Sequence, residues 1–494
     1  MIFDSTINKE IYKSFLEWIH NQDNHVRIER YEDHDEYYHG EVDVKIPSNI
    51  KAVLAKEFGF TGNVCRAVVD AAVRFLSKES LSIELKVPRG IDEEEREDDR
   101  GEAEAYIYEL FRQSKLLMKN YIKALRIQGK KGEFALKAVR VLDDNEEEVA
   151  GYKINVLKPD ICFPKWKDEN YEEMEYFSVQ YLRDNPDTGE KEQYAQVIWP
   201  DQIAEFVKPI DADDGVQWTK IDEWENEYGF IPVEWVRNKE DDTPWSESDI
   251  TDDLKDIQDG FNKAITDLLY SMDSESFRQV FVMGSGPPKD EKGNPKDVES
   301  APGKIHWING KGEKVPSLAE IEPSNFEGLL SSIDKLLEIV SVITHTPKNE
   351  LSRGGSGSVP TGVALRTIYQ PFIGKTNEKW ALFKSGAEGI ITKIFQMAET
   401  DNVDVSFNNY DYIPEVHNES GLPKDEEERA KVHEFELNNK IKSRRTIQQE
   451  RGVEDVEKEN DQIKEEEEEM MSRADPYGER VNRELGTGEG EVDL

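Results

Sequence analysis

Apolar residues recur every three or four positions in three long stretches of the chain, which is the period of an amphipathic helix. The first two stretches are 249–272 and 324–346, with stripes formed by Ile250, Leu254, Ile257, Phe261, Ile265, Leu268 and Met272 and by Phe326, Leu329, Leu330, Ile333, Leu336, Leu337, Val340 and Ile343. Largely off the first stripe lie Asp252, Asp253, Asp256, Asp259 and Asp267. The third stretch, 361–399, predicts a long helix that Pro371 should kink, because proline removes a backbone hydrogen bond.

Shorter helices are predicted over 1–24, 62–77 and 102–127, and Asn63 is a candidate N-cap of the second. Residues 27–49 form a tyrosine-rich segment that leads into a short strand, and 81–90 alternate like a strand. A strongly charged helical region is predicted over 423–471, and the end of the chain is expected to be disordered.

Between 132 and 240 short segments alternate apolar and polar residues, which is typical of strands separated by turns. The clearest are 134–142, 148–157, 176–182, 193–199, 203–209 and 231–238, and a further strand is predicted at 403–414. Two β-like segments, 279–284 and 304–310, lie between the first two long helices, separated by Pro- and Gly-rich residues. The chain is therefore predicted to be α+β, without an internal repeat.

Composition narrows the class of protein. The chain has 494 residues, which suggests two to four structural units, and its 20 Phe, 18 Tyr and 9 Trp argue for packed cores. The net charge of −42 repels DNA and argues against a protein that reads a base sequence. It is compatible with a surface that DNA passes without adhering. The acidic run 91–101 is expected to be solvated.

The two cysteines, Cys65 and Cys162, have apolar neighbours and are predicted to be buried free thiols. The N-terminus lacks a signal-peptide pattern, and no stretch approaches the ~18 apolar residues of a membrane helix. We therefore expect a soluble, intracellular protein without a membrane partner.

Patterns that would indicate an enzyme are weak. The glycine–serine segment 353–362 lacks the Lys-Ser/Thr of a phosphate-binding loop, so we interpret it as a mobile loop. His34 and His39, with Asp35 and Glu36 between them, suggest either a metal site or a surface cluster, and we favour the cluster. We predict no enzymatic activity, no cofactor and no metal, although a two-metal nuclease with dispersed carboxylates stays an alternative.

The order of these predicted helices, strands and loops resembles the order found in the portal family of long-tailed phages. The resemblance is carried by ERYEDHDEYYHGEVDV (29–44), GNVCRAVVDAAVRFL (62–76), IPVEWVRN (231–238) followed by SESDI (246–250), and PTGVALR (360–366) after the glycine–serine loop. Each motif alone is weak, but their order holds from about residue 10 to 450.

The resemblance implies a subunit with wing, stem, clip and crown that assembles as a ring. The implied parts are an N-terminal wing (1–245), a stem helix (246–272), a small α/β clip (273–323), a second stem helix (324–347), a tunnel loop (348–360), the rest of the wing (361–414), a helical crown (415–475) and a disordered tail (476–494).

The same resemblance implies a function and partners. The protein would form a dodecameric ring at one capsid vertex of the virion, made in the host cytoplasm, as the channel for packaging and ejection of double-stranded DNA. Its partners would be the terminase large subunit, the head–tail adaptor, and the major capsid and scaffolding proteins. The alternatives are an acidic virion scaffold or adaptor without DNA passage, and a monomer in which the two helices form an ordinary hairpin.

The resemblance also implies site residues. DNA would contact the loop residues Lys348, Arg353, Gly354, Gly355, Ser356, Gly357 and Ser358. Lys348 and Arg353 would either touch phosphate or pair with local carboxylates. Lys375 and Lys379 are interpreted as ion-pair partners between subunits. His306 and Trp307 would contact an adaptor, or Trp307 would pack inside the clip.

Overall fold

The structure is a computed structural model of the chain. It describes residues 22–42, 62–87, 97–143, 149–167, 171–185, 188–209, 218–240, 242–276, 280–283, 292–293, 305–308, 317–320, 326–351, 362–401, 403, 412–418, 433–444, 447–448, 458–460 and 462–464. The chain divides into two units, Met1–Gly421 and Leu422–Leu494. The second unit contains short helical segments such as 433–438, in the region predicted to be helical.

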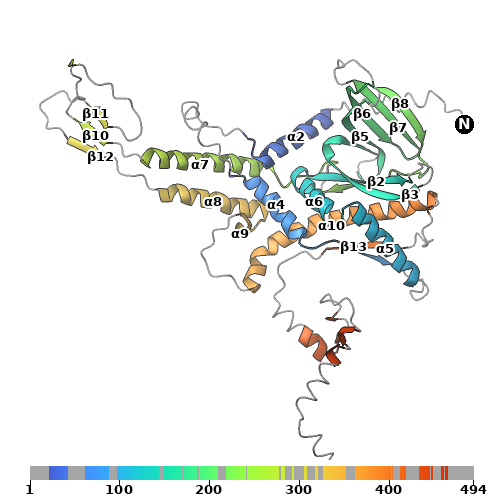
Figure 1. The fold of residues 1–494 in the computed structure, drawn as a ribbon. Coiled ribbons are helices and arrows are strands. Elements are labelled where there is room, and N and C mark those ends of the chain that lie inside the picture. The colour runs from blue at the N-terminus through green and yellow to red at the C-terminus, as the bar shows by residue number, and fades with distance from the viewer. Residues whose placement is uncertain are drawn as a thin grey trace, which may run out of the picture. The chain divides into compact units, whose positions relative to one another are not determined.

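Two antiparallel sheets and several helices form an α+β body in the first unit (Figure 1). The three-stranded sheet has the order β3-β2-β9, from β2 (Glu133–Leu142), β3 (Val149–Leu157) and β9 (Val233–Arg237). The five-stranded sheet runs β4-β5-β6-β7-β8, from β4 (Cys162–Trp166), β5 (Met174–Asp184), β6 (Lys191–Ile198), β7 (Gln202–Pro209) and β8 (Thr219–Glu225). Phe177, Ile198 and Val233 belong to one core between them.

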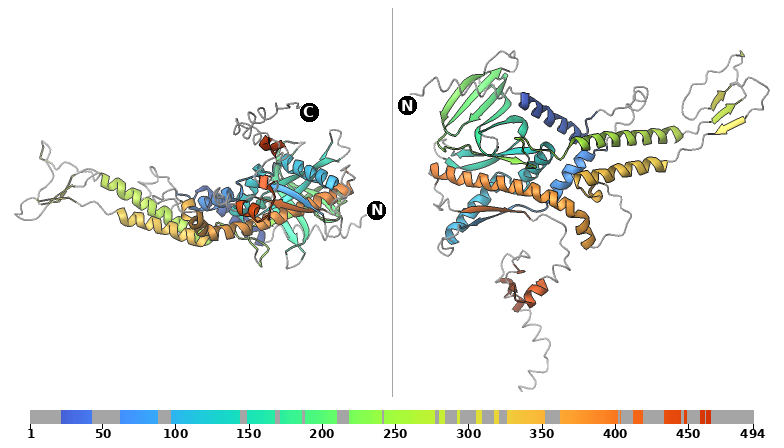
Figure 2. Two further views of the ribbon diagram at one scale, coloured as in Figure 1. Left: turned by 90° about the horizontal axis from the view of Figure 1, so that it is seen from below. Right: turned by 180° about the vertical axis from the view of Figure 1, so that it is seen from behind.

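The helices of the body are α2 (Gln22–His39), α4 (Val64–Leu76), α5 (Glu97–Gln113), α6 (Lys119–Lys131) and the long α10 (Gly362–Thr400). The α10 helix packs along β9 and β2, and Gly386 permits this approach because a Cβ there would overlap Val236. Pro371 lies inside α10, and Figures 1 and 2 show that the helix bends toward its N-terminal end, as predicted.

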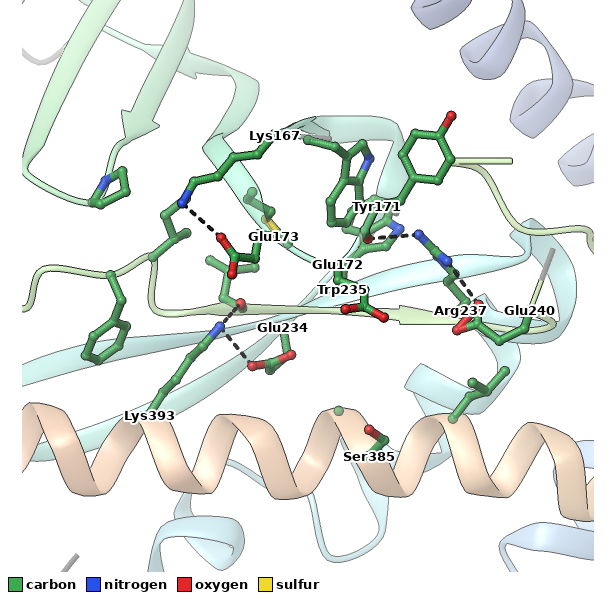
Figure 3. Close-up of a pocket in the computed structure, with 18 of the residues that line it drawn as sticks. Lys167, Tyr171, Glu172, Glu173, Glu234, Trp235, Arg237, Glu240, Ser385 and Lys393 are labelled. Atoms are coloured by element: carbon green, nitrogen blue, oxygen red, sulfur yellow. Dashed lines mark hydrogen bonds and ion pairs between the residues drawn. The ribbon is translucent and has the colours of Figure 1, made fainter. Parts of the chain in front are cut away.

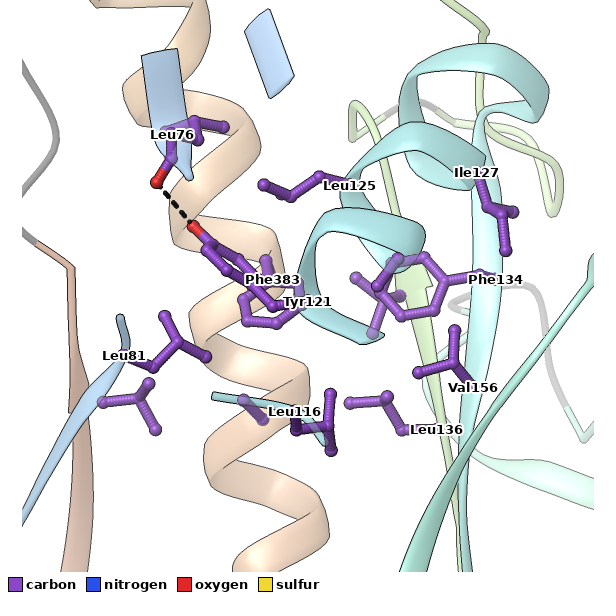
Figure 4. Close-up of a cluster of buried hydrophobic side chains, with 14 of the residues drawn as sticks. Leu76, Leu81, Leu116, Tyr121, Leu125, Ile127, Phe134, Leu136, Val156 and Phe383 are labelled. Carbon is purple, nitrogen blue, oxygen red and sulfur yellow. Dashed lines mark hydrogen bonds between the residues drawn. The ribbon is translucent and has the colours of Figure 1, made fainter. Parts of the chain in front are cut away.

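The main core joins segments that are far apart in the sequence (Figure 4). Tyr121 of α6 lies 4.9 Å from the ring of Phe383 on α10, and its hydroxyl donates to the carbonyl of Leu76 at 3.0 Å. Nearby, β1 (Ser82–Lys86) pairs antiparallel with β13 (Ile413–His417). Cys65 and Cys162 are buried and unpaired, as predicted.

The tyrosine-rich segment is largely the helix α2, which the sequence did not predict, and the short strand expected after it lies outside the described residues. The buried face of α2 consists of Asn24, Arg27, Tyr31, His34 and Tyr38, which recur at helical spacing but are mostly polar. Arg27 is 2 % exposed: it donates to the carbonyl of Cys162 at 2.8 Å and lies over the ring of Trp245 at 4.3 Å. A pattern scored by hydrophobicity misses such a helix because polar contacts hold its inner face.

Other predicted elements are confirmed or corrected individually. The helix over 62–77 is confirmed as α4, and Asn63 Oδ1 accepts the backbone N–H of Arg66 at 2.8 Å. The helix over 102–127 is wrong as one element, since α5 and α6 are separated near Lys115, which has φ 56°. The strand β13 overlaps only the last two residues of the strand predicted over 403–414, and most of that strand lies outside the described residues, as does most of the helix over 1–24. Strands β4, β8 and β12 (Ser317–Glu320) were not predicted.

Candidate functional site at the helical hairpin and its base

Two long helices leave the body side by side as a hairpin (Figures 1 and 2). They are α7 (Asp252–Ser276) and α8 (Phe326–Thr344), close to the predicted bounds. Buried positions of the two predicted stripes include Leu254 and Phe261 on α7 and Leu337 and Val340 on α8. These parts of the two stripes therefore face inward near the body, whereas Met272, Leu330 and Ile343 of the predicted stripes are exposed.

The insert between the helices is a small sheet in its described part. Its order is β11-β10-β12, formed by β10 (Val280–Met283), β11 (Ile305–Ile308) and β12, and β11 runs parallel to β10. His306 and Trp307 belong to β11, opposite Phe281 and Val282. Their side chains lie outside the described part, so contact with an adaptor stays a prediction.

The outer surface of the hairpin carries two kinds of side chain. On α7 the acidic residues Asp252, Asp253, Asp256 and Asp267 are exposed, as their position off the stripe predicts. On α8 three apolar residues near the C-terminal end are exposed: Ile339 (46 %), Val342 (72 %) and Ile343 (39 %). We call these three the outer α8 face. Adjacent exposed apolar residues of this kind are typical of a contact surface for another molecule.

A buried ion cluster fixes the base of the hairpin to α10. Asp249, three residues before α7, contacts Lys379 Nζ at 2.5 Å and Lys375 Nζ at 3.3 Å. Lys375 Nζ also donates to the carbonyl of Thr344 at 3.2 Å, so it caps the end of α8. Burial raises the pKa of Asp249, but the two lysines outweigh it, so the net shift is downward and the carboxylate stays ionised.

This cluster corrects the interpretation of Lys375 and Lys379 as partners of another subunit. Both are paired within the chain, and their side chains are 12 % and 3 % exposed. Asn238 adds a hydrogen bond from its Nδ2 to Asp249 at 3.3 Å. A mutually satisfied cluster of this kind holds the hairpin at a defined angle to the body.

A second polar contact joins α7 to α4. The side-chain oxygen of Gln258 accepts the first backbone N–H of α4, from Val64, at 2.7 Å, and its nitrogen donates to the carbonyl of Gly62 at 2.7 Å. One amide thus satisfies groups that the start of a helix leaves without partners. It places α4 against the base of the hairpin.

The predicted DNA-contacting residues are only partly described. Lys348 begins the short helix α9 (Lys348–Leu351), and its Nζ lies 3.3 Å from Asp334 and 3.9 Å from Glu338 on α8. This geometry favours the local ion-pair alternative for Lys348. The other predicted loop residues, Arg353, Gly354, Gly355, Ser356, Gly357 and Ser358, lie outside the described residues.

Two cations that lie beside α9, where the predicted DNA-contacting loop begins, were not identified from the sequence. Arg66 and Arg74 of α4 line a groove together with Asn349 and Glu350 of α9. They are nearly 280 residues before the loop, so only the contact between α4 and α9 reveals them. The detectable signal was their position on the polar side of a helix that is otherwise apolar.

A pocket of about 460 Å³ lies in the body between β9, α10 and the turn before β5 (Figure 3). Each of its three cations is held by a glutamate: Lys393 by Glu234 at 2.8 Å, Arg237 by Glu240 at 3.0 Å and Lys167 by Glu173 at 3.0 Å. Since these charges are compensated, the lining offers no ready site for an anionic substrate.

The two histidines of α2 do not form the single surface cluster that the sequence suggests, because His34 is buried whereas His39 is exposed. His34 is 4 % exposed, and no group of three metal-binding side chains occurs among the described residues. Burial, with help from Lys255 and Arg30, lowers the pKa of His34 to about 3. The ring is therefore neutral inside the body.

Neutral His34 predicts a loss of stability in mild acid. The folded-state pKa lies below the ordinary value of 6.5, so the unfolded chain binds the extra proton. The contribution is complete above about pH 6.5 and falls by ~1.4 kcal/mol per pH unit below it. Urea unfolding at pH 7, 6 and 5 should show this slope and its reduction in His34→Gln. The exposed residue of the same helix, His25, provides the control variant His25→Gln; equal slopes in both variants would contradict the assignment.

Comparison of the chain with models of known protein families identifies a family that it matches. The family model described as "Phage portal protein, SPP1 Gp6-like" matches residues 18–473. A comparison with curated protein sequences found no match. None of the described helices is long and apolar enough to span a membrane.

Proposed function

Because the chain belongs to the phage portal protein family, we propose that twelve copies form a closed ring at one capsid vertex and that double-stranded DNA is packaged and ejected through its centre. Membership of this family makes the protein a component of a phage capsid. The dodecamer, the channel and the docking partners are the proposal. The observation that carries it is the outer α8 face, which the hairpin leaves uncovered.

The outer α8 face supports assembly from identical subunits. Burying an exposed Val or Ile side chain contributes roughly 1.5–3 kcal/mol, and a ring gains this at every interface. A contact between two different surfaces of one protein closes into a ring when its rotation fits. The inner side of each hairpin already packs on its own body through Leu337 and Val340. The outer face is then available for a neighbouring subunit.

The charge of the chain supports a channel of low friction. Twelve chains of −42 carry a formal charge of about −500, largely neutralised by counterions. DNA binding gains affinity when cationic side chains release counterions from phosphates. An acidic wall does not offer this gain, so DNA would move along it without being retained. The exposed aspartates of α7 are suited to such a wall.

We assign the remaining partners from the position of each part along the subunit. The small sheet β10–β12 lies at the far end of the hairpin (Figure 1) and would meet the terminase large subunit and later the head–tail adaptor. The major capsid and scaffolding proteins would contact the ring during assembly in the host cytoplasm. We propose no enzymatic activity and no cofactor for this chain, since the energy for DNA movement would come from the terminase.

Electron microscopy and mass photometry of the purified protein test the ring directly. We expect a ring of about a dozen subunits with a central hole, as closed heterologous contacts produce. Deleting 352–358 should leave the ring intact and sharply reduce DNA-filled capsids, because the loop would face the duplex. The variant Ser352→Ala serves as the control. A closed dimer or a particle without a hole would favour the scaffold or adaptor alternative, and normal filling by the deletion variant would contradict the loop assignment.

A further inference from the structure

The α4 helix exposes only two of its thirteen residues, and both are arginines. Arg66 and Arg74 are the exposed positions, whereas eight residues of the helix are buried in the body. They are eight positions apart and share the polar side of α4 with Asn63 and Asp70. In a chain with a net charge of −42, a helix whose only exposed residues are cationic is unusual.

These arginines line a groove at the start of the tunnel loop. The groove has a volume of about 460 Å³ and is formed by Asn63, Arg66, Ala67, Asp70, Arg74, Asn349 and Glu350. Arg74 Nη2 lies 3.4 Å from Glu350 Oε2, and Arg66 Nε lies 3.4 Å from Asp70 Oδ2. A third guanidinium, that of Arg126 on α6, contacts Asp70 at 3.3 Å. Three cations thus meet two carboxylates.

The carboxylates orient the arginines without saturating them. Asp70 also accepts the hydroxyl of Tyr38 at 2.9 Å, and Glu350 accepts that of Tyr369 at 2.9 Å. Arg66 and Arg74 each use one nitrogen in these ion pairs, although a guanidinium carries five N–H donors. Both side chains are 58 % exposed, and exposed ion pairs contribute little free energy. An incoming oxyanion can therefore use the outward donors.

We propose that Arg66 and Arg74 contact the phosphate backbone of double-stranded DNA beside the tunnel loop, in place of Lys348. The inference rests on the proposed function, because it requires the groove to face the duplex. Residues eight apart on a helix are separated by about 12 Å along its axis, and a DNA strand advances about 3.4 Å per nucleotide. With α4 parallel to the duplex axis, the pair would span three or four nucleotides.

The chemistry suits a duplex that must pass whatever its sequence. Phosphate contacts carry no base information, so the same side chains serve every segment of a genome. Three guanidiniums, counting that of Arg126 beside the groove lining, face two carboxylates, and this surplus of one positive charge attracts the backbone locally, while the acidic surroundings oppose a lasting grip. Lys348 is less suited, because Asp334 and Glu338 already hold its single ammonium group.

Photo-crosslinking in assembled capsids tests this placement. A photoreactive amino acid would replace Asn349 in the groove, Ser356 in the loop, or Ser385 in the body pocket (Figure 3). We expect DNA crosslinks from positions 349 and 356 and none from 385. Crosslinks from 356 without 349 would overturn the groove assignment and leave the channel standing. Absence of crosslinks from both positions would overturn the proposed channel itself.

A charge variant tests the arginines themselves. Arg66→Gln/Arg74→Gln should form normal rings, and its crosslink yield at position 349 should fall about tenfold, equivalent to about 1.4 kcal/mol. Arg112→Gln/Lys220→Gln removes the same charge from exposed positions elsewhere on the body and should leave the yield unchanged. Loss of ring formation in the first variant would assign the arginines to subunit contacts, and an unchanged yield would also overturn the inference.

Discussion

Replacing Asp249 with asparagine is expected to destabilise the folded subunit by about 3–5 kcal/mol, which is the cost of leaving a buried charge without its partner. The substitution preserves shape but removes the only negative charge that contacts both Lys375 and Lys379 in the described structure. The ammonium groups of buried Lys379 and of Lys375, which is 12 % exposed, then face a neutral amide. A loss of this size is a large part of the stability of an ordinary domain.

The expected consequence of Asp249→Asn is local as well as global. Lys375 also caps α8 through the carbonyl of Thr344, so the base of the hairpin should loosen before the body unfolds. Urea unfolding gives the free energy, and hydrogen exchange of α7 and α8 shows whether the hairpin opens first.

A matched control lies three residues away. Asp252→Asn removes the same charge from a side chain that is 96 % exposed and pairs with Lys255 at 3.0 Å. It should change the free energy of unfolding by no more than about 0.5 kcal/mol. Adding Lys379→Met to Asp249→Asn should recover part of the loss, since one buried charge is removed. Equal effects of Asp249→Asn and Asp252→Asn would show that the cluster is not a structural anchor.

Placing two charges on the outer α8 face is expected to abolish ring assembly while each subunit stays folded. The variant is Ile339→Asp/Val342→Asp, at positions that are 46 % and 72 % exposed. Exposed positions tolerate polar residues within about 0.5 kcal/mol in the monomer. In a subunit interface the same change removes apolar burial and introduces carboxylates that must be desolvated. Mass photometry should show monomers, with an unchanged circular dichroism spectrum.

A control variant on the same helix tests the effect of added charge alone. Ser331→Asp/Ser332→Asp adds two carboxylates at exposed serines nearer the start of α8. Rings should survive in this variant if the apolar side chains form the contact. Equal loss of assembly in both variants would mean that added charge is responsible, and intact rings in the first variant would remove the outer α8 face from the interface.

The long elements were predictable from the sequence because they are repetitive and amphipathic. A stripe repeated over six or seven turns identifies α7 and α8 whatever packs against them, and the alternating segments of 132–240 identify most strands of the two sheets. The resemblance to portal proteins came from the order of such elements, and the family match over residues 18–473 confirms it.

Elements that depend on polar contacts were not predictable in the same way. The inner face of α2 is formed largely by Arg27, Tyr31 and His34, so it has no hydrophobic signal. The charged edge strand β8 was missed because most of its residues are exposed and it has little apolar alternation.

The sequence by itself determined the class of fold, the hairpin, the acidic surface and the family, because each of these depends on local periodicity, on composition or on the order of the elements. Only the tertiary structure decided which charges meet. It placed Asp249 beside Lys375 and Lys379, more than 120 residues later, and Arg74 beside Glu350, 276 residues later. A lysine has the same local pattern whether it pairs within its chain, pairs with a neighbour or binds phosphate. The choice is made by the side chains that folding brings within a few ångströms of it.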